Sequence, residues 1–263
     1  MEILTESAFA KLNLTLDVLS RREDGYHDIR SVEQTISLRD DVVLNVGTGR
    51  KWALHCYQER VRDGAELATE GYPQDAENLA WKAAEVFFDR TGHDPEGLEI
   101  FINKRIPMQA GLGGGSADAA AVLRALNRHY GAPLSIGALS ELGFSIGADV
   151  PFCVMCGTAL VEGRGERITK LPDVPEIFFV VCKPDFSIST PELYRAIDGE
   201  FIEKRPDHKA MIANLQKGDL LGVGGSLRNV FEPLVMKEHF DVNYIKSMMF
   251  TYGAYGAQMT GSG

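Results

Sequence analysis

The chain has 263 residues, of which 44% are hydrophobic and 24% charged, a composition typical of a globular protein with one large domain or two moderate ones. Its formal net charge of −10 argues against broad nucleic-acid binding, which needs a basic surface to displace counterions. A phosphorylated small ligand is not excluded, because a few backbone N–H groups and one lysine can hold a phosphate inside an acidic protein.

The N-terminal segment MEILTESAFAKLNL carries acidic residues where a signal peptide would be basic, and no apolar run nears the roughly 18 residues that a membrane-spanning helix needs. We therefore expect a cytoplasmic protein. Among the four cysteines, only Cys153 and Cys156 have metal-like or redox-like spacing. Because a zinc site needs four ligands and no second close Cys or His pair occurs, buried structural thiols are favoured.

The first half of the chain mixes strands and helices. Alternation of apolar and polar residues predicts strands at 10–18, 31–38, 41–46 and 98–107, the last ended by Pro107. Apolar residues at helical spacing predict helices at 77–92, 116–130 and 135–144. Residues 47–76 are turn-rich and give no clear pattern.

The second half begins with a buried strand, predicted from the apolar run PEIFFVVCKPD at 175–185. Three helices are expected after it, at 191–197, 206–217 and 235–250. Because no regular βαβ alternation runs along the chain, an α+β fold is favoured over a doubly wound sheet. The change of pattern suggests two domains, residues 1–158 and 159–263.

Four glycines between Gly111 and Gly115 separate a predicted strand from an alanine-rich helix. Such a cluster loses much backbone entropy on folding, so it indicates a tight turn or a close approach. The N–H groups of a helix's first turn favour an anion, and glycines remove the Cβ atoms that would hold a phosphate away. The loop is therefore a candidate phosphate cradle. A flexible turn, with the helix capped by the Ser116 hydroxyl, is the alternative.

Three common glycine motifs do not fit this loop. The chain contains no Gly-Lys-Ser or Gly-Lys-Thr sequence, which a Walker A loop requires. The dinucleotide fingerprint G-x-G-x-x-G needs a glycine where this chain has Ser116. The hydrolase elbow G-x-S-x-G needs its last glycine where this chain has Asp118.

Three polar residues stand out elsewhere. Lys11 and Asn13 project to the polar face of the strand at 10–18, which for these two alone favours a solvated surface. Asp149 is the one charged residue of FSIGADVPFCVM, and a buried carboxylate needs a partner or hydrogen bonds. It is either a turn aspartate before Val150 or a buried aspartate beside a lysine, a pair suited to proton transfer.

Three stretches together resemble the GHMP kinase superfamily: AFAKLNLTLDVLSRREDGYHDIRSV, IPMQAGLGGGSADAAAVLRALN and GADVPF. The combination of AKLNLTLDV with DGYH is similar to the branch that phosphorylates a cytidine-diphosphate-linked methylerythritol in non-mevalonate (MEP pathway) isoprenoid synthesis. The resemblance is strong to about residue 160 and recurs weakly at PDFSISTPELY and AQMTGSG. It implies a two-domain fold, with an ATP-binding domain like ribosomal S5 domain 2 and a ferredoxin-like substrate domain.

The resemblance also implies a reaction, in which ATP with Mg²⁺ donates its γ-phosphate to a tertiary hydroxyl. Asp149 matches the catalytic base and Lys11 its electrostatic partner. The positions that match ATP contacts are Asn78, Leu79, Lys104 and Pro107 at the nucleoside end, and Gly111, Leu112, Gly113, Gly114, Gly115 and Ser116 at the phosphates. The magnesium ligands are unknown, and Ser116 is one candidate.

By the same resemblance, substrate contacts fall at Asn13, Tyr26, His27, Thr190 and Tyr194. The two tyrosines could stack on the cytosine ring, and backbone groups or the ring of His27 could read its hydrogen-bonding edge. Ordinary core packing is the alternative for both tyrosines. No nucleic-acid or membrane partner is expected, and monomer and dimer both stay open.

The sequence departs from the family pattern at Ala110, where a glycine is common, and at Ala117, where a second serine is common. It ends at MTGSG, where relatives continue, so we expect a shortened chain. Two other functions stay open: another GHMP kinase of the mevalonate or homoserine type, and a non-catalytic RNA-binding protein with an S5-like fold. The DGYH segment argues against the first, and the net charge of −10 against the second.

Overall fold

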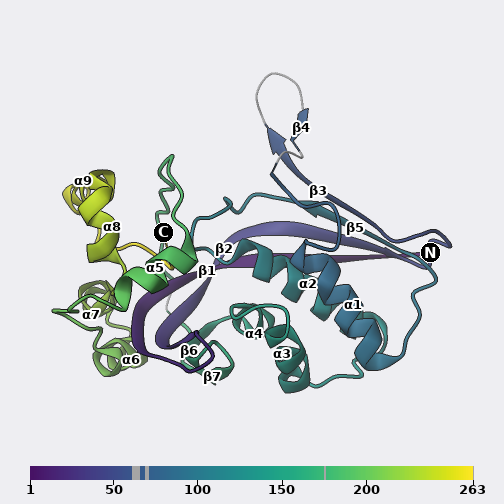
Figure 1. Ribbon diagram of the computed structural model, residues 1–263, viewed down its shortest axis with the longest axis horizontal. Coiled ribbons are helices and arrows are strands. Elements are labelled where there is room, and N and C mark those ends of the chain that lie inside the picture. Colours follow the sequence, from purple (N-terminus) through teal and green to yellow (C-terminus); the bar gives the residue numbers. More distant parts are fainter. Residues whose placement is uncertain (61–65, 69–70, 175, 263) are drawn as a thin grey trace. The chain divides into compact units, whose positions relative to one another are not determined.

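A computed structural model describes residues 1–60, 66–68, 71–174 and 176–262 (Figure 1). The chain forms two compact units: unit 1 comprises Met1–Ala10, Ile36–Pro107 and Gly113–Cys156, and unit 2 comprises Lys11–Thr35, Met108–Leu112 and Gly157–Gly263. A single boundary near residue 158 does not describe this grouping. The reason is that strands β1 (Glu2–Arg21) and β2 (His27–Val46), each 20 residues long, contribute to both units.

The sheet of unit 1 has the order β4-β3-β5-β2-β1. Strand β5 (Leu98–Asn103) lies antiparallel to residues 41–46 of β2 and parallel to β3 (Ala53–Arg60). Strand β4 (Glu66–Ala68) pairs with the end of β3. Two strands therefore lie in the turn-rich region 47–76, where no element was predicted. Its residues 61–65 and 69–70 lie outside the described part.

Four helices lie in the described part of unit 1, and Figure 1 shows α1 and α2 side by side. They are α1 (Leu79–Thr91), α2 (Gly114–His129), α3 (Ile136–Phe144) and α4 (Val150–Met155). The predicted helices at 77–92, 116–130 and 135–144 are confirmed, while α4 was not predicted. Helix α2 is buried along most of its length, because its many alanines let α1, α3 and α4 approach closely.

Two details of unit 1 differ from the sequence prediction. Helix α2 begins at Gly114 behind Gly113, which takes a left-handed conformation (φ 69°), and no side chain caps the helix, so the predicted Ser116 cap is wrong. The strands predicted at 31–38 and 41–46 are one continuous strand, β2. No glycine or proline interrupts that stretch, so nothing in it requires a turn.

The sheet of unit 2 has the order β7-β6-β2-β1-β8. Strand β6 (Thr158–Gly163) is antiparallel to residues 29–34 of β2 and to β7 (Arg167–Lys170). The short strand β8 (Arg228–Asn229) pairs in parallel with Thr15 and Leu16 of β1. This arrangement brings residues from the start of the chain beside residues more than 200 positions later.

The helices of unit 2 are α5 (Thr190–Ile197), α6 (His208–Lys217), α7 (Leu220–Ser226), α8 (Glu232–Glu238) and α9 (Phe240–Thr251). The helices predicted at 191–197 and 206–217 are confirmed. The single helix predicted at 235–250 is wrong, because His239 adopts a non-helical backbone (φ −119°, ψ 83°) and divides the segment into α8 and α9.

The buried strand predicted at 175–185 is also wrong. Residues 176–185 form no regular element, and the side chain of Phe178 is 93% exposed. Only Phe179 packs against the apolar cluster around Leu14 and Met211. An apolar run becomes a buried strand only when other strands pair with it, and within the described residues none pairs with this one.

Candidate active site

The N-terminus of α2 in unit 1 has the features of an anion site. The helix starts at Gly114, its N-cap is Gly113, and no side chain bonds to its first N–H groups as a cap. The first turn of an α-helix carries N–H groups without intrahelical partners and a partial positive charge. Since Gly114 and Gly115 have no Cβ, a phosphate could approach this backbone closely.

Predicted nucleotide residues lie beside this helix start within unit 1. A Cβ atom built on Gly115 would be 3.6 Å from Cδ1 of Leu79, and one on Gly114 would be 3.5 Å from Nζ of Lys104. Asn78 precedes Leu79 and caps α1, because its Oδ1 accepts a hydrogen bond from the N–H of Ala80 at 3.0 Å. The N-termini of α1 and α2 and the Lys104 ammonium are therefore neighbours.

The Lys104 side chain is buried in an ion cluster that the sequence did not reveal. Its ammonium donates to Oδ2 of Asp40 and, at 2.6 Å, to Oδ2 of Asp118 on α2. The other Asp40 oxygen accepts the backbone N–H of Ile106 at 2.8 Å. Lys104 thus ties β2 to the first turns of α2 through two carboxylates.

Burial and charge determine the protonation of this cluster. Burial raises the pKa of Asp118 well above its usual range and Asp40 adds to that shift, while the Lys104 charge opposes it. Burial by itself lowers the pKa of Lys104, but the charges of Asp118 and Asp40 raise it by more than burial lowers it. The net pKa of Lys104 is therefore raised, and the lysine stays an ammonium ion.

Asp149 occupies the N-cap position of α4 in unit 1 and is half-buried. The turn before it is closed by the N–H of Val150, which donates to the carbonyl oxygen of Gly147 at 3.1 Å. A Cβ atom built on Gly147 would lie 3.9 Å from the Ser116 hydroxyl oxygen. The turn that carries Asp149 therefore packs against the first turn of α2.

Lys11 and Asn13, on β1 in unit 2, are buried rather than solvated, with Lys11 only 4% exposed. The Lys11 ammonium donates to Oδ1 of Asn13 at 2.8 Å. The Asn13 amide in turn donates to Oγ of Ser31 at 2.8 Å and to Oε1 of Glu33 at 2.9 Å. The solvated-face interpretation is wrong, because Ser31 and Glu33 of β2 provide buried partners.

The segment 258–262 lies against this polar face of β1. The Thr260 hydroxyl accepts the N–H of Asn13 at 2.9 Å, and the Gln258 amide donates to the Asn13 carbonyl oxygen at 2.8 Å. A Cβ atom built on Gly111 would overlap the Thr260 carbonyl. Within unit 2, the glycine loop therefore meets this segment by direct backbone contact, and the N–H of Lys11 bonds the carbonyl of Leu112 at 3.0 Å.

The predicted substrate residues also gather within unit 2. The rings of His27 and Tyr194 lie 5.1 Å apart, and Nε2 of His27 is 2.7 Å from Oδ1 of Asp198. Tyr26 is 57% exposed, with the guanidinium of Arg164 3.8 Å above its ring. The hydroxyl of Thr190, at the start of α5, lies 2.6 Å from that of Ser262.

Comparisons with known proteins identify the family. The GHMP kinases N-terminal domain model matches residues 78–157. A 4-diphosphocytidyl-2-C-methyl-D-erythritol kinase from Caldicellulosiruptor saccharolyticus is 43% identical over 259 residues, which are 97% of this chain and 84% of the relative. A crystal structure of a 4-(cytidine 5'-diphospho)-2C-methyl-D-erythritol kinase matches with a TM-score of 0.75 and 33% identity, covering 99% of this chain and 87% of the other.

The chain belongs to the 4-diphosphocytidyl-2-C-methyl-D-erythritol kinase family. This kinase is therefore a small-molecule phosphotransferase of the GHMP class, whose members use ATP, and its α+β GHMP fold is confirmed. A homoserine kinase from Cytophaga hutchinsonii also matches, with a TM-score of 0.68, 100% of this chain and 83% of the other covered, but at 19% identity it shows the fold alone.

The predicted site residues of this kinase have partners that the sequence did not reveal. Asp40 and Asp118 hold Lys104, Thr260 and Gln258 bond Asn13, and Asp198 bonds His27. The resemblance of the segment AQMTGSG to the family is a sequence signal that points to residues 258–260. For the three aspartates, the sequence offers no comparable signal.

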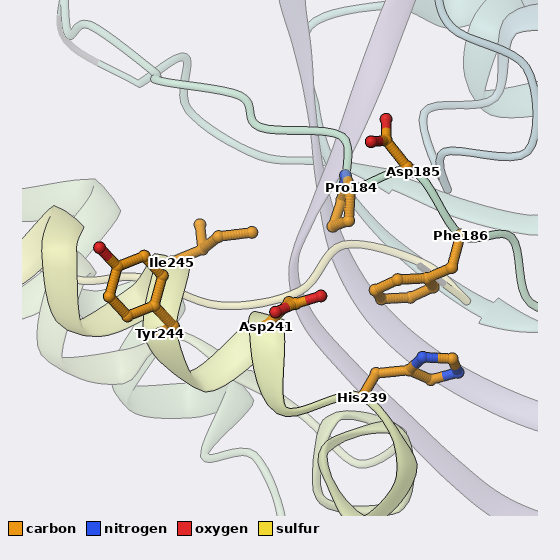
Figure 2. A pocket seen from close by; sticks show the side chains of 7 residues that line it. All are labelled: Pro184, Asp185, Phe186, His239, Asp241, Tyr244 and Ile245. Atoms are coloured by element: carbon orange, nitrogen blue, oxygen red, sulfur yellow. The ribbon is translucent and has the colours of Figure 1, made fainter.

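A hollow on unit 2 is formed by residues from the segments 184–186 and 239–245. It is lined by Pro184, Asp185, Phe186, His239, Asp241, Tyr244 and Ile245 (Figure 2). The rings of Phe186 and His239 stack at 3.9 Å and 12°. None of the residues predicted to bind ATP or substrate lines this hollow.

The hydroxyl oxygen of Ser116, in the first turn of α2, fits a ligand of a magnesium ion, because Mg²⁺ prefers oxygen ligands. No group of three His, Cys, Asp or Glu that could hold a metal occurs in the described part of the kinase. Mg²⁺ in nucleotide sites is usually held by one or two protein oxygens, the substrate phosphates and several waters, so such a cluster is not required.

Two further expectations can be compared with the structure. Cys153 is buried and Cys156 half-buried, and the Cys156 thiol donates to the Cys153 carbonyl oxygen at 3.2 Å, as expected for structural thiols. Within the described ranges of the kinase, no helix combines the length and the apolar character needed to cross a bilayer.

Proposed function

We propose that this chain transfers the γ-phosphoryl group of ATP to the 2-hydroxyl of 4-diphosphocytidyl-2-C-methyl-D-erythritol. The observation that carries the proposal is a likeness of 33–43% identity to kinases named for this substrate, over 97–99% of the chain. The uncapped α2 N-terminus beside the Asp149 turn supports it, since a phosphate cradle next to a carboxylate suits phosphoryl transfer. The MEP pathway of isoprenoid synthesis, in the cytoplasm, is the setting this implies.

ATP binds with its phosphates against the backbone of Gly113–Ser116 and its nucleoside end near Asn78 and Leu79. The side chain of Leu79, 3.6 Å from the Cβ position of Gly115, supplies apolar contact next to the cradle. Lys104 contributes by holding the helix start, because its ammonium is already bonded to two carboxylates. Gly111, Leu112 and Pro107 shape the loop that leads to it.

Asp149 accepts the proton of the substrate hydroxyl, and Lys11 neutralises charge on the transferring oxygens. A tertiary alcohol is a crowded, poor nucleophile. Phosphoryl transfer has a loose transition state, so placement and electrostatics supply most of the acceleration. Lys11 is fixed for this role by its bond to Asn13, which Ser31 and Glu33 hold in turn. When bound, Mg²⁺ would neutralise the nucleotide oxygens, with the Ser116 hydroxyl as the candidate protein ligand.

The cytidine end of the substrate binds among Tyr26, His27, Tyr194 and Thr190. Arg164 covers one face of the Tyr26 ring, so a base can stack on the other face. The neighbouring rings of His27 and Tyr194 form a second aromatic wall in the same unit. Asn13 faces the methylerythritol part from β1.

A panel of alcohols tests the proposal. ADP release is measured with the diphosphocytidyl substrate, mevalonate and homoserine, each at equal concentration and with excess Mg²⁺. Turnover of the cytidine-linked compound alone is expected. Phosphorylation of mevalonate or homoserine, with none of the cytidine compound, would assign the chain to another GHMP substrate.

A further inference from the structure

The His27 ring is held in a fixed orientation by two residues of α5. Its Nε2 atom lies 2.7 Å from Oδ1 of Asp198, which ends the helix, and its ring packs beside Tyr194, one turn earlier. His27 itself is buried at the start of β2. An imidazole held at its edge and on its face has little freedom to rotate.

The second oxygen of Asp198 meets a cation. Nη1 of Arg21, at the end of β1, lies 3.4 Å from Oδ2 of Asp198. Asp198 therefore joins α5 to both sides of the turn that carries Tyr26. Both oxygens of the Asp198 carboxylate therefore face nitrogen atoms, Nη1 of Arg21 and Nε2 of His27.

An ionised carboxylate only accepts hydrogen bonds, so the proton of this contact belongs to Nε2 of His27. A neutral imidazole has one N–H donor and one nitrogen acceptor, and the bond that one nitrogen makes determines the role of the other. With Nε2 protonated, Nδ1 is an acceptor. The contact with Asp198 thus determines which ring nitrogen of His27 can accept a hydrogen bond from a ligand.

We propose that Asp198 is a specificity-determining positioning residue: it fixes His27 in the Nε2–H tautomer, so that Nδ1 accepts a hydrogen bond from the exocyclic amine of cytosine and disfavours uracil. This inference rests on the proposed function, in which His27 reads the base. Uracil has a carbonyl oxygen where cytosine has the amine, and two acceptors facing each other leave both unpaired. A site built to bond a donor rejects the analogue that lacks it.

Ring ¹⁵N shifts of histidine test the tautomer without any substrate. The full chain is labelled at its six histidines and measured at pH 7.5, and His27→Asn assigns the signal. The expected result is an Nε2–H tautomer in the wild type that becomes a tautomer mixture in Asp198→Ala. A protonated Nδ1 in the wild type, or an unchanged signal in Asp198→Ala, overturns the proposal whatever the enzyme phosphorylates.

Kinetics test the consequence for specificity. kcat/KM is measured for the cytidine-linked substrate and its uridine-linked analogue. In Asp198→Ala the ratio of kcat/KM for the cytidine substrate to that for the uridine analogue is expected to fall by about tenfold or more, mostly through KM. This is the effect of losing one hydrogen bond that only cytosine can make. Asp198→Asn, whose amide oxygen can still accept, is expected to retain much of the preference.

Asp28→Ala is the matched control, because Asp28 bonds Arg22 at 2.9 Å in the same β1–β2 region but not His27. It should keep the wild-type preference. Equal losses on both substrates in Asp198→Ala would indicate a structural role only and overturn the specificity claim. Absence of wild-type turnover on the cytidine substrate would instead remove the proposed function, and the ¹⁵N result would still decide the tautomer.

Discussion

The ammonium of Lys104 lies 2.6 Å from Oδ2 of Asp118, at the end of helix α2 that begins with the glycine cradle. Both side chains are buried, and Asp40 bonds the same ammonium from β2. The position of the cradle relative to the sheet of unit 1 thus depends on one cation between two carboxylates. Removing that cation has a consequence that can be measured.

Lys104→Met should destabilise the protein by about 3–5 kcal/mol, because two buried carboxylates lose their partner. Urea unfolding measures the change in the free energy of unfolding. The control is Arg105→Met, since Arg105 pairs with Asp41 at 2.6 Å on a half-exposed surface and should contribute less than about 1 kcal/mol. Similar losses in the two variants would show that the buried cluster does not hold the helix.

Lowering the pH should reduce the free energy of unfolding, partly because His208 takes up a proton. Burial, and next the charge of Arg30, lower the pKa of His208 to about 4, and its Nδ1 lies 2.9 Å from the Thr15 hydroxyl. The unfolded chain binds a proton near pH 6.5, but the folded chain binds it only near pH 4. The free energy of unfolding should therefore fall as pH drops from about 6.5 to about 4, and be insensitive to this group above that window.

The measurement for His208 is the urea midpoint between pH 7.5 and 4.5. In His208→Gln part of the decline should disappear, whereas the exposed His55→Gln should follow the wild type. A decline of the same steepness in all three proteins would rule out a contribution from His208.

Gly111→Ala should disturb the contact between the glycine loop and Thr260. Gly111 has φ +65°, and a methyl group there would overlap the Thr260 carbonyl, so a loss of about 1–3 kcal/mol beyond simple backbone strain is expected. Gly131→Ala is the matched control, because φ is +78° there and none of the described atoms lies within 4 Å. It should lose only about 1–2 kcal/mol from strain. Thermal unfolding measures the stability of both variants. A smaller loss of stability in Gly111→Ala than in Gly131→Ala would contradict the close contact between Gly111 and Thr260.

Asp149→Asn should lower kcat by about 10²- to 10⁴-fold, because an amide cannot accept the hydroxyl proton. Titration calorimetry with a nonhydrolysable ATP analogue should show little change in affinity, since the cradle is backbone. Asp89→Asn, at an exposed position of α1, serves as the control and should turn over normally. A fast Asp149→Asn enzyme would exclude this aspartate as the base.

Tyr26→Ala should mainly raise KM for the cytidine substrate, by an amount equivalent to about 1–3 kcal/mol of lost stacking. The ring has one face covered by Arg164 and is otherwise half-exposed, which suits a stacking surface better than a core residue. Steady-state kinetics compares it with Tyr252→Ala, a tyrosine that is 84% exposed. An unchanged KM would place Tyr26 outside the pocket.

Local sequence determined most elements of unit 1. Alternation located β1, and apolar residues at helical spacing up to Gly92 located α1, because periodicity and stop signals act within a few residues. The glycine cluster and Asp149 also stood out locally, as residues that are unfavourable unless something requires them.

Only the tertiary structure decided which residues are partners. From the sequence, Lys11 and Asn13 are predicted to lie on a solvated face, but Ser31, Glu33 and Thr260 bond Asn13. Likewise, nothing near Lys104 in the sequence indicates that Asp40 and Asp118 are its partners. Residues 176–185 do not form the predicted strand, because no described strand pairs with them. Burial and pairing are properties of distant segments brought together, so a side chain's own neighbours in the chain cannot fix its environment.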